Sequence, residues 1–595
     1  MTQCLVKSKG FFSCVFLLAL GNLAGVAGPG PRSLPAAAFE DGLTPDWVIT
    51  SEEIERSGAA VLGEVLGRFA GLEVIDRGYL GARKLLSLTG IPPDRLLVLI
   101  DGEVVDDPGS RTFDINLIPI SAVERIEVFR HPIFLDRDTR AAGGVVKVTT
   151  KRHEGGEPFT RLTLTGGSLQ TNILRGSFRR GLLQDRLGLS LSVNRMTTGG
   201  LDTEGDHSSL QYHIRADERF LDKVELSLWG TGTASSVEAA AGEESVREVG
   251  TGFHAVNVSA TLRPNERTRF DVLTTFTRHA RDSLDQETSA FVEEREEDRI
   301  AMRLKGTGQA TGWLAVSVGL EGEHLRVDER SERSQLAIVP GAFLDLDSFP
   351  RTEFMMRWEQ ERSLSSNWSG GVSTSQAIGR TSSLFLSFWQ VRHHPPLSGG
   401  VPPGREWESE RLIESGLRYG FGRLRGSLSG FFRRTRGEST PTDVDVFVPS
   451  DPLFEYREIG WRSTAAVEAW KTVSMRLGYQ LVDVRDASPG EVEVPIPLHY
   501  VTGALEARRS FKHDNLGLGA AISGTYVSGR GQAIPASLAG DDHYGALDLN
   551  LSLRIVDVTF FLTVRNLLDG RYAIVGGYPM PGRVGRFGFT WDFYD

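Results

Sequence analysis

From residue 153 to the end of the chain, one segment after another alternates between apolar and polar residues. The run Leu187–Asn194 reads Leu-Gly-Leu-Ser-Leu-Ser-Val-Asn, and the same period of two recurs in Val224–Leu228, Leu314–Leu320 and Leu547–Arg554. Successive side chains of a β-strand point to opposite faces, so each segment predicts a strand with one apolar and one polar face. Alternation over so much of the chain predicts many antiparallel strands in one closed sheet.

Two kinds of closed sheet fit this alternation: a soluble sandwich or propeller, and a membrane barrel. The polar faces are rich in Gly, Ser, Asn and Asp, whereas a soluble closed sheet would fill its core with large residues. No internal repeat of the length of a propeller blade is evident. A membrane barrel with a wet or plugged lumen therefore fits better. In such a barrel the polar stretches Ser236–Glu248, Asp282–Arg299, His394–Glu410 and Ser488–Pro497 are expected to be extracellular loops.

The first residues have the layout of a secretory signal peptide. Lys7 and Lys9 form the positive region, and Phe11–Val26 is the apolar region. The small residues Gly25-Val26-Ala27 form a cleavage site, so the mature chain is expected to begin near Gly28. The alternative is a retained N-terminal anchor helix, which the glycines within the segment disfavour.

Cysteine usage and charge exclude several functional classes. Both cysteines, Cys4 and Cys14, lie in the signal segment, so an exported chain would have no disulfide and no cysteine metal site. The formal net charge of -11 argues against a nucleic-acid partner, and the basic run Arg433–Arg436 is expected to face solvent or lipopolysaccharide. The content of 24% charged residues excludes a helical protein with many apolar spans. No nucleophile elbow, paired histidine metal motif or phosphate loop is present, so the chain is not predicted to be an enzyme.

The part of the chain before the alternating region has another pattern. In Thr50–Gly71 apolar residues recur at the 3.6-residue period of a helix, and the first four residues have the spacing of a capping box. Leu96–Ile100 is an apolar run that predicts a buried strand, and Asp101-Gly102 after it is a strong turn pair. A small α+β domain is therefore expected here.

Segments at both ends of the chain resemble TonB-dependent outer-membrane receptors, and their motifs are most similar to those of vitamin B12 and siderophore receptors. They are Leu96–Gly102, Ile118–Arg130, Gly143–Lys151, Asn566–Tyr572 and Gly577–Arg583. The resemblance implies a membrane all-β fold in the bacterial outer membrane, a 22-stranded antiparallel transmembrane β-barrel with an N-terminal α+β plug domain in its lumen. The implied parts are a signal peptide (1–27), an N-terminal periplasmic segment (28–44), the plug domain (45–152) and the barrel (153–595).

The resemblance also implies a function. Receptors of this kind take up a scarce, bulky nutrient, here a cobalamin-like compound or an iron chelate, which binds to the plug and the extracellular loops. The implied partners are the TonB-ExbB-ExbD energising complex, outer-membrane lipid and lipopolysaccharide, and the small-molecule nutrient. An alternative is a plugged barrel that acts as a surface binding or adhesion protein without energised uptake, and a secreted β-rich hydrolase is a third reading.

Three departures from the family pattern bear on this choice. Residues 28–46 contain no clear TonB box, and Trp47–Thr50 is expected to be the first strand of the plug. The usual Arg-Gly before the central strand is replaced by Thr89-Gly90, and the usual Arg-Gly-Pro by Arg130-His131-Pro132. The sequence ends in Phe593-Tyr594-Asp595 where the family pattern expects a terminal aromatic residue. Energy coupling is therefore inferred from the family alone.

Three sets of residues follow from the resemblance. The predicted ligand-binding residues are Arg77, Tyr79, Arg83, Asp106, Asp107 and Arg111. The plug motif consists of Asp101, Gly102, Glu124, Arg125, Glu127, Arg130, Gly143 and Gly144. The C-terminal barrel motif consists of Asn566, Leu567, Asp569, Tyr572, Pro581, Gly582 and Arg583.

No cofactor is required by the sequence, but two groups of residues suggest a metal. Asp202, Glu204 and Asp206 alternate in a Gly-flanked loop, where hard oxygen ligands could gather around calcium; a solvated acidic loop is the alternative. His393-His394 is the only adjacent histidine pair that could supply axial ligands to haem, and a pair on the surface of a loop is the competing interpretation.

Overall fold

The computed structural model describes residues 45–594, with gaps at 70, 89–90, 92, 131–134, 154, 202–203, 221–222, 241–245, 286–289, 328–330, 347–348, 363–365, 395–407, 439–452, 471, 487–496, 512–514, 531–540 and 576–577. The predicted signal peptide, the periplasmic segment, Thr89-Gly90 and His131-Pro132 lie outside the described residues.

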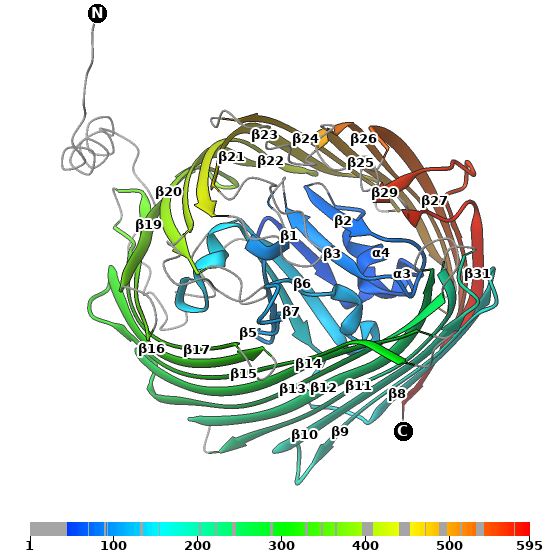
Figure 1. Cartoon of the computed structure of the whole chain (residues 1–595), viewed down its shortest axis with the longest axis horizontal. Helices are drawn as coiled ribbons and strands as arrows, with labels where there is room; N and C mark the ends of the chain where they lie inside the picture. The colour runs from blue at the N-terminus through cyan, green and yellow to red at the C-terminus, as the bar shows by residue number, and fades with distance from the viewer. Residues whose placement is uncertain are drawn as a thin grey trace, which may run out of the picture.

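Twenty-two antiparallel strands form one closed barrel (Figure 1), which confirms the predicted fold class. In chain order they are β8 (Phe159–Gly167), β9 (Thr171–Leu182), β10 (Leu187–Thr198), β11 (Glu204–Phe220), β12 (Val224–Ala240), β13 (Val246–Asn265), β14 (Thr268–Asp285), β15 (Ala290–Gln309), β16 (Leu314–Val327), β17 (Ser331–Leu344), β18 (Arg351–Glu361), β19 (Asn367–Ile378), β20 (Ser382–His393), β21 (Glu408–Phe421), β22 (Leu424–Glu438), β23 (Leu453–Trp470), β24 (Val473–Asp486), β25 (Pro497–Phe511), β26 (Leu516–Arg530), β27 (His543–Ile555), β28 (Val558–Arg565) and β31 (Val584–Tyr594). The last strand pairs with the first, from Arg586 opposite Gly167 to Tyr594 opposite Phe159, and this pairing closes the sheet.

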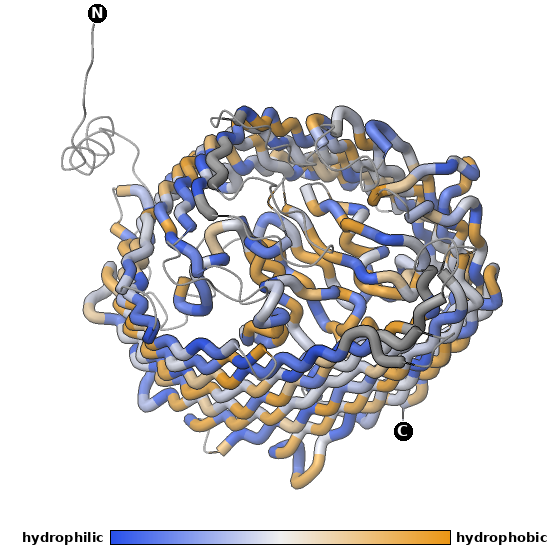
Figure 2. Tube along the Cα trace, in the orientation of Figure 1, coloured by the Kyte–Doolittle hydropathy of each residue, from blue (hydrophilic) through white to orange (hydrophobic). Residues whose placement is uncertain are grey.

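The period-two pattern separates the two faces of the wall. On β11, Leu210 and Ile214 are 51% and 53% exposed on the outside, whereas Gln211 and His213 are buried on the inside. Figure 2 shows the same alternation of hydrophobic and hydrophilic residues along the barrel strands. An apolar exterior suits lipid, and a polar interior suits a lumen that holds water or protein.

Two of the expected extracellular loops are largely strand. The ladder of β12 and β13 continues through Val237 opposite Val249, and β14 and β15 reach Asp285 and Ala290. Backbone pairing in a hairpin is insensitive to side-chain polarity, so the Glu- and Ser-rich composition that suggested loops did not end these strands.

A smaller domain with strands and short helices fills the lumen (Figure 1). Its elements are β1 (Trp47–Thr50), α3 (Ser51–Arg56), α4 (Leu62–Leu66), β2 (Leu72–Asp76), β3 (Lys84–Leu88), η1 (Pro93–Arg95), β4 (Leu97–Ile100), β5 (Glu103–Val104), η2 (Ile115–Leu117), η3 (Ile120–Ala122), β6 (Val123–Phe129), η5 (Thr139–Ala142) and β7 (Val145–Thr150). One sheet has the order β1-β6-β7-β4-β5, and β2 pairs with β3 in a separate hairpin. We call this domain the plug; its first strand is Trp47–Thr50, as expected.

The predicted helix over Thr50–Gly71 is wrong in extent, because two short helices stand in its place. Thr50 caps α3 with the predicted capping box, in which its side chain accepts a hydrogen bond from the Glu53 N–H. The turn after α3 contains Gly58 at φ +60, a left-handed conformation that ends a helix. No helix among the described residues is long and apolar enough to cross a membrane.

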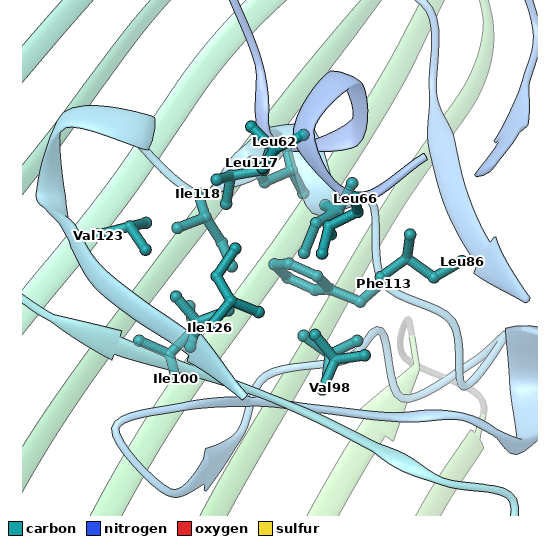
Figure 3. Close-up of a cluster of buried hydrophobic side chains, with 14 of the residues drawn as sticks. Leu62, Leu66, Leu86, Val98, Ile100, Phe113, Leu117, Ile118, Val123 and Ile126 are labelled. Atoms are coloured by element: carbon teal, nitrogen blue, oxygen red, sulfur yellow. The ribbon is translucent and has the colours of Figure 1, made fainter. Parts of the chain in front are cut away.

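The core of the plug forms around Phe113 (Figure 3). The Phe113 ring lies between Leu62 and Leu66 of α4 and the strand residues Val98 and Ile126, all of them less than 5% exposed. The cluster extends into the wall, where the Phe113 and Phe253 rings meet edge to face with centroids 5.4 Å apart. The plug therefore shares part of its core with the barrel.

Candidate functional site

Two loops of the plug lie toward the barrel rim that carries the long connections. The first apical loop, residues 77–83, joins β2 to β3, and the second apical loop, residues 105–114, follows β5. Arg77 lies over the ring of Tyr578, in the connection between β28 and β31, at 5.5 Å from its centroid. Short turns and long connections occupy opposite rims of an outer-membrane barrel, and the long ones face outward.

The first apical loop is fixed at its base. Asp76 accepts hydrogen bonds from the Gly78 N–H at 3.1 Å and from the Lys84 ammonium. The Tyr79 side chain is 5% exposed, and its hydroxyl lies 3.2 Å from Thr171 Oγ1 on the barrel wall. Tyr79 thus seats the loop against the wall.

The second apical loop is folded around Asp107. Its Oδ1 accepts hydrogen bonds from the N–H groups of Gly109 at 2.8 Å and Ser110 at 3.0 Å. Burial alone would raise the pKa of Asp107, but the side-chain hydrogen bond with Glu297 and the nearby His279 outweigh it and hold the pKa well below its usual range.

The two loops are joined to each other. Arg83 Nη2 donates to Thr112 Oγ1 at 2.7 Å, and the Lys84 N–H donates to Asp114 Oδ1 at 3.1 Å. Both apical loops therefore form one surface whose relative position is set by direct hydrogen bonds.

Ion pairs tie the second apical loop to the plug body and to the wall. Asp106 pairs with Arg140 of the plug at 2.6 Å and with Arg299 of β15 at 3.2 Å. Arg111 lies 3.4 Å from Glu408 at the start of β21 and donates to the backbone oxygen of His394. The six predicted ligand residues thus divide into two groups: Tyr79, Asp106 and Arg111 are buried in contacts with the protein, and Arg77, Arg83 and Asp107 are half-buried. Their role in ligand binding stays a prediction.

Sequence reasoning missed the partners on the wall. Glu103 of β5 meets Arg303 of β15 at 3.0 Å, and Asp136 meets Lys305 at 2.7 Å. The sequence pattern that could have indicated these partners is the row of charged residues along one face of β15. Alternate residues of a barrel strand point into the lumen, where they can contact the plug.

Residues of the plug motif hold the central sheet and seat it. Asp101 and Gly102 form the β4–β5 turn with φ angles of 50° and 88°. The Asp101 carboxylate accepts a hydrogen bond from the Thr150 N–H at 2.9 Å and pairs with Arg215 of the wall at 2.8 Å. This one side chain links two plug strands to the barrel.

The remaining plug-motif residues have structural contacts. On β6, Glu124 accepts a hydrogen bond from Ser51 at 3.4 Å, and Arg125 and Glu127 pair at 3.4 Å. Arg130 donates two side-chain hydrogen bonds to Asp46, at 3.0 and 2.9 Å. The glycines Gly143 and Gly144 pass close to other chain segments: a Cβ on Gly143 would lie 2.0 Å from the Arg95 carbonyl oxygen, and Gly144 has φ +128.

The C-terminal motif organises the connection between β28 and β31, which contains β29 (Ala573–Val575) and β30 (Tyr578–Pro579). Asn566 donates to the carbonyls of Gly570 at 2.7 Å and Pro581 at 3.0 Å, so its amide fastens both ends of the connection. The Tyr572 ring stacks on Tyr544 of β27 with centroids 4.7 Å apart. The remaining motif residues hold the backbone: Leu567 donates to Leu547, Asp569 accepts from the Arg583 N–H, and Gly582 passes close to Asp569.

A cavity of about 120 Å³ lies below the first apical loop, between the plug and strands β25–β28. Tyr79, Tyr500, Tyr544 and Tyr572 line it, together with charged side chains of both signs. Aromatic rings with a few convergent polar groups are the usual lining of a small-molecule site.

Comparison with known proteins agrees with this geometry. A family described as the TonB-dependent Receptor Plug Domain matches residues 40–145. The plug of this chain is thus similar to the plug of TonB-dependent receptors, and it lies inside a closed 22-stranded barrel. A large closed barrel that holds a plug indicates the bacterial outer membrane. The relatives named below are receptors and transporters.

Individual relatives show how far the likeness extends. The vitamin B12 transporter BtuB of Photobacterium profundum is 33% identical over 140 residues, which are 24% of this chain and 23% of that protein. The aligned part therefore spans about a quarter of the length of this curated relative.

Solved structures match over nearly the whole chain. The siderophore receptor PirA from Acinetobacter baumannii has a TM-score of 0.77 at 14% identity and covers 92% of this chain and 98% of its own. An enterobactin-bound mutant of the ferric enterobactin receptor PfeA from Pseudomonas aeruginosa has a TM-score of 0.76 at 15% identity, covering 93% and 100%. The FrpB iron transporter from Neisseria meningitidis, F3-3 variant, has a TM-score of 0.76 at 13% identity, covering 92% and 100%. At these identities the likeness shows the fold.

The predicted calcium ligands are only partly described. Asp202 and the side chain of Glu204 lie outside the described residues, and Asp206 is exposed on β11. Within the described part of the chain, no group of three His, Cys, Asp or Glu side chains could hold a metal ion. Calcium binding stays a prediction.

The histidine pair lies inside the protein, so the expectation of a pair on the surface of a loop is wrong. His393 is fully buried with Nε2 3.5 Å from Glu410, and the His394 Nδ1 lies 2.7 Å from Glu361. The strand β20 extends to His393 and turns both side chains toward carboxylates of neighbouring strands. Neither imidazole is presented to a bulky ligand such as haem.

Proposed function

We propose that this chain is a receptor-transporter that binds a scarce, bulky nutrient at the apical loops and admits it when the TonB-ExbB-ExbD complex rearranges the plug. The observation that carries the proposal is a folded plug, matched to the plug-domain family, lodged in a closed barrel. A 22-stranded barrel without a plug would be an open pore, so the plug makes passage conditional.

The contacts between plug and wall support a need for energy input. Ion pairs such as Asp101–Arg215 and Glu103–Arg303 are buried, with side chains less than 10% exposed. Separating a buried pair leaves each of its charges with one partner fewer, at a cost of up to about 3–5 kcal/mol for each pair. The free energy of ligand binding alone would offset only a part of the cost of separating several such pairs. An external force on the plug is therefore the mechanism that is consistent with these contacts.

The ligand class we propose is a cobalamin-like compound or an iron chelate. The apical surface offers Arg77 and Arg83 as partly accessible cations and Tyr578 as an aromatic surface, which suit an anionic or amide-rich ring-bearing ligand. The names of the relatives point to the same two classes: vitamin B12, siderophores and ferric enterobactin.

A deletion strain tests the proposal. Growth should fall under limitation of one nutrient among cobalamin, siderophore-bound iron and haem, and return with the full chain on a plasmid. Deletion of TonB should remove the benefit of that plasmid. Unchanged growth on all three nutrients would overturn the ligand class, and growth that is independent of TonB would overturn energised uptake.

The alternative is a plugged barrel that binds at the cell surface without energised uptake. The feature that favours it is the absence of a clear TonB box in residues 28–46. Direct binding of a peptide with this sequence to the periplasmic domain of TonB separates the two functions, because only the transporter requires it.

A further inference from the structure

The plug contacts the wall on two opposite sides of the barrel. Toward β14–β21 the contact is dense: besides the ion pairs of Glu103 and Asp106, the plug residues Leu97 and Leu99 belong to one apolar cluster with Trp389 and Val391 of β20. On the opposite side α3 and α4 face β24–β28 and β31, as Figure 1 shows. The cavities on this side are larger than the cavity of about 30 Å³ between the plug and β15–β17.

Two of these cavities lie one above the other along the same strands. The upper one, of about 120 Å³, is the cavity below the first apical loop, and the lower one, of about 70 Å³, lies between α3 and β24–β27. A water molecule needs about 10–15 Å³ measured in this way, so each cavity has room for several.

The order of residues along the strands shows that the two cavities follow each other from the rim with long connections toward the rim with short turns. On β27, which runs from the rim with long connections to the rim with short turns, Tyr544 and Asp548 line the upper cavity, and Asn550 and Ser552 line the lower one. On β25 the upper cavity has Tyr500 and the lower one extends to Arg508. With an advance of about 3.3 Å per residue, these eight steps span about 26 Å of the wall.

Arg68 and Ser523 line both cavities and therefore form the boundary between them. Arg68 follows α4, and its Nη2 donates to the Ser57 carbonyl at 3.2 Å across the turn between the two helices. Among the described residues, its Nε, the Ser523 hydroxyl and both polar atoms of the Asn550 side chain are buried and have no hydrogen-bond partner. Buried polar atoms without a protein partner are costly unless water meets them, so we expect water at this junction.

We propose that Arg68 closes a hydrated seam between α3–α4 and strands β25–β28, and that hydrophilic solute crosses the barrel through this seam when the plug moves. The second half of this statement rests on the proposed transport function; the first half does not. The lining carries both signs of charge, with Glu64, Asp76 and Asp548 opposite Lys84 and Arg565 in the upper cavity, so the seam accepts polar solutes without selecting one sign.

The chain offers a matched control. Arg175 of β9 also donates to carbonyls of the turn between α3 and α4, to Ala59 at 3.0 Å and to Ala60 at 2.7 Å. It lines a separate cavity of about 60 Å³ that shares neither Arg68 nor Ser523 with the other two. Removing Arg175 loosens the same turn without opening the junction.

The test is ion conductance of the purified full-length protein in a planar lipid bilayer, with no ligand and no TonB. Arg68→Ala should raise the open fraction roughly tenfold, which corresponds to about 1.4 kcal/mol and is the size of one hydrogen bond from a charged donor. Arg175→Ala should stay at the level of the unchanged protein, and Arg68→Lys should fall between the two. Equal currents for Arg68→Ala and Arg175→Ala would mean general loosening of the plug and would overturn the proposal. An Arg68→Ala protein whose conductance equals that of the unchanged protein would also overturn it.

A second substitution covers the case in which Arg68→Ala fails to fold. Ser523→Cys in the otherwise unchanged protein should react slowly with a membrane-impermeant thiol reagent and faster as Arg68→Lys is added. Ser523→Phe, placed at the same junction, should abolish the added conductance of Arg68→Lys. Conductance that persists with Ser523→Phe places the current elsewhere. None of these measurements uses uptake, so failure of the seam and failure of the transport function are distinguishable.

Discussion

At the scale of single residues, Gly143 leaves no room for a side chain. A Cβ at this position would lie 2.0 Å from the backbone oxygen of Arg95, which cannot rotate away as a side chain could. Gly143→Ala should therefore destabilise the plug by about 1–3 kcal/mol through overpacking. Gly166→Ala in β8 is the control, because its Cβ would meet nothing within 4 Å. Thermal unfolding in detergent measures both; equal midpoints would contradict the prediction.

A second prediction concerns Glu64, whose carboxylate ties the start of α4 to Arg586 of the last strand at 2.7 Å. Burial alone would raise the pKa of Glu64, but Arg586 and Arg565 outweigh it and hold the pKa well below the usual range. A carboxylate whose pKa is lower in the folded state contributes stability above its unfolded pKa of about 4.3, and this contribution is lost as the pH falls further.

The thermal midpoint of the unchanged protein should therefore fall between about pH 5 and pH 3 more steeply than that of Glu64→Gln. At neutral pH the variant should be the less stable one, because Arg586 loses its charged partner. Parallel pH profiles for the two proteins would show that the Glu64 pKa is the same in the folded and unfolded chains.

At the scale of elements, the barrel strands were predictable because their signal is local. A strand with one face in lipid and one in the lumen must alternate, and Leu187–Asn194 alternates without exception. The α3–α4 region was less predictable, since the 3.6-residue period continues across Ser57 and Gly58 although the backbone turns there. A local pattern of apolar residues does not report a left-handed turn.

The contacts of the candidate site were the least predictable part. Glu103 and Arg303 are 200 positions apart in the chain, and nothing near either residue identifies the other. The apical loops could be located from the family resemblance, but burial of Tyr79, Asp106 and Arg111 depends on where the wall lies. Those pairings arise only when the barrel closes around the plug.

The pair of Glu103 and Arg303 gives a prediction at this scale. Both side chains are at most 3% exposed, so Arg303→Met leaves a buried carboxylate with one partner fewer and should cost about 3–5 kcal/mol. Adding Glu103→Gln should recover a part of this loss, because the uncompensated charge is removed. Arg485 and Asp483, an exposed pair on β24, are the control: Asp483→Asn should change stability by less than about 1 kcal/mol. An additive double variant would show that the two groups do not interact.

At the scale of the whole molecule, the proposed transport requires that the plug move relative to the wall, and a cross-link between the two should stop it. Ser121 of the plug contacts Asn194 of β10, with 2.6 Å between Ser121 Oγ and the side-chain amide. The double variant Ser121→Cys, Asn194→Cys should lose nutrient-dependent growth under oxidising conditions and regain it with a reductant. The background is favourable because the two natural cysteines, Cys4 and Cys14, both precede the described residues.

Thr163→Cys with Thr590→Cys is the matched control, since those hydroxyls lie 2.9 Å apart between β8 and β31 and a disulfide there joins barrel to barrel. Full growth with the oxidised plug-to-wall link would contradict a transport cycle that displaces this face of the plug, whereas loss of growth in both variants would point to a general effect of oxidation on the barrel.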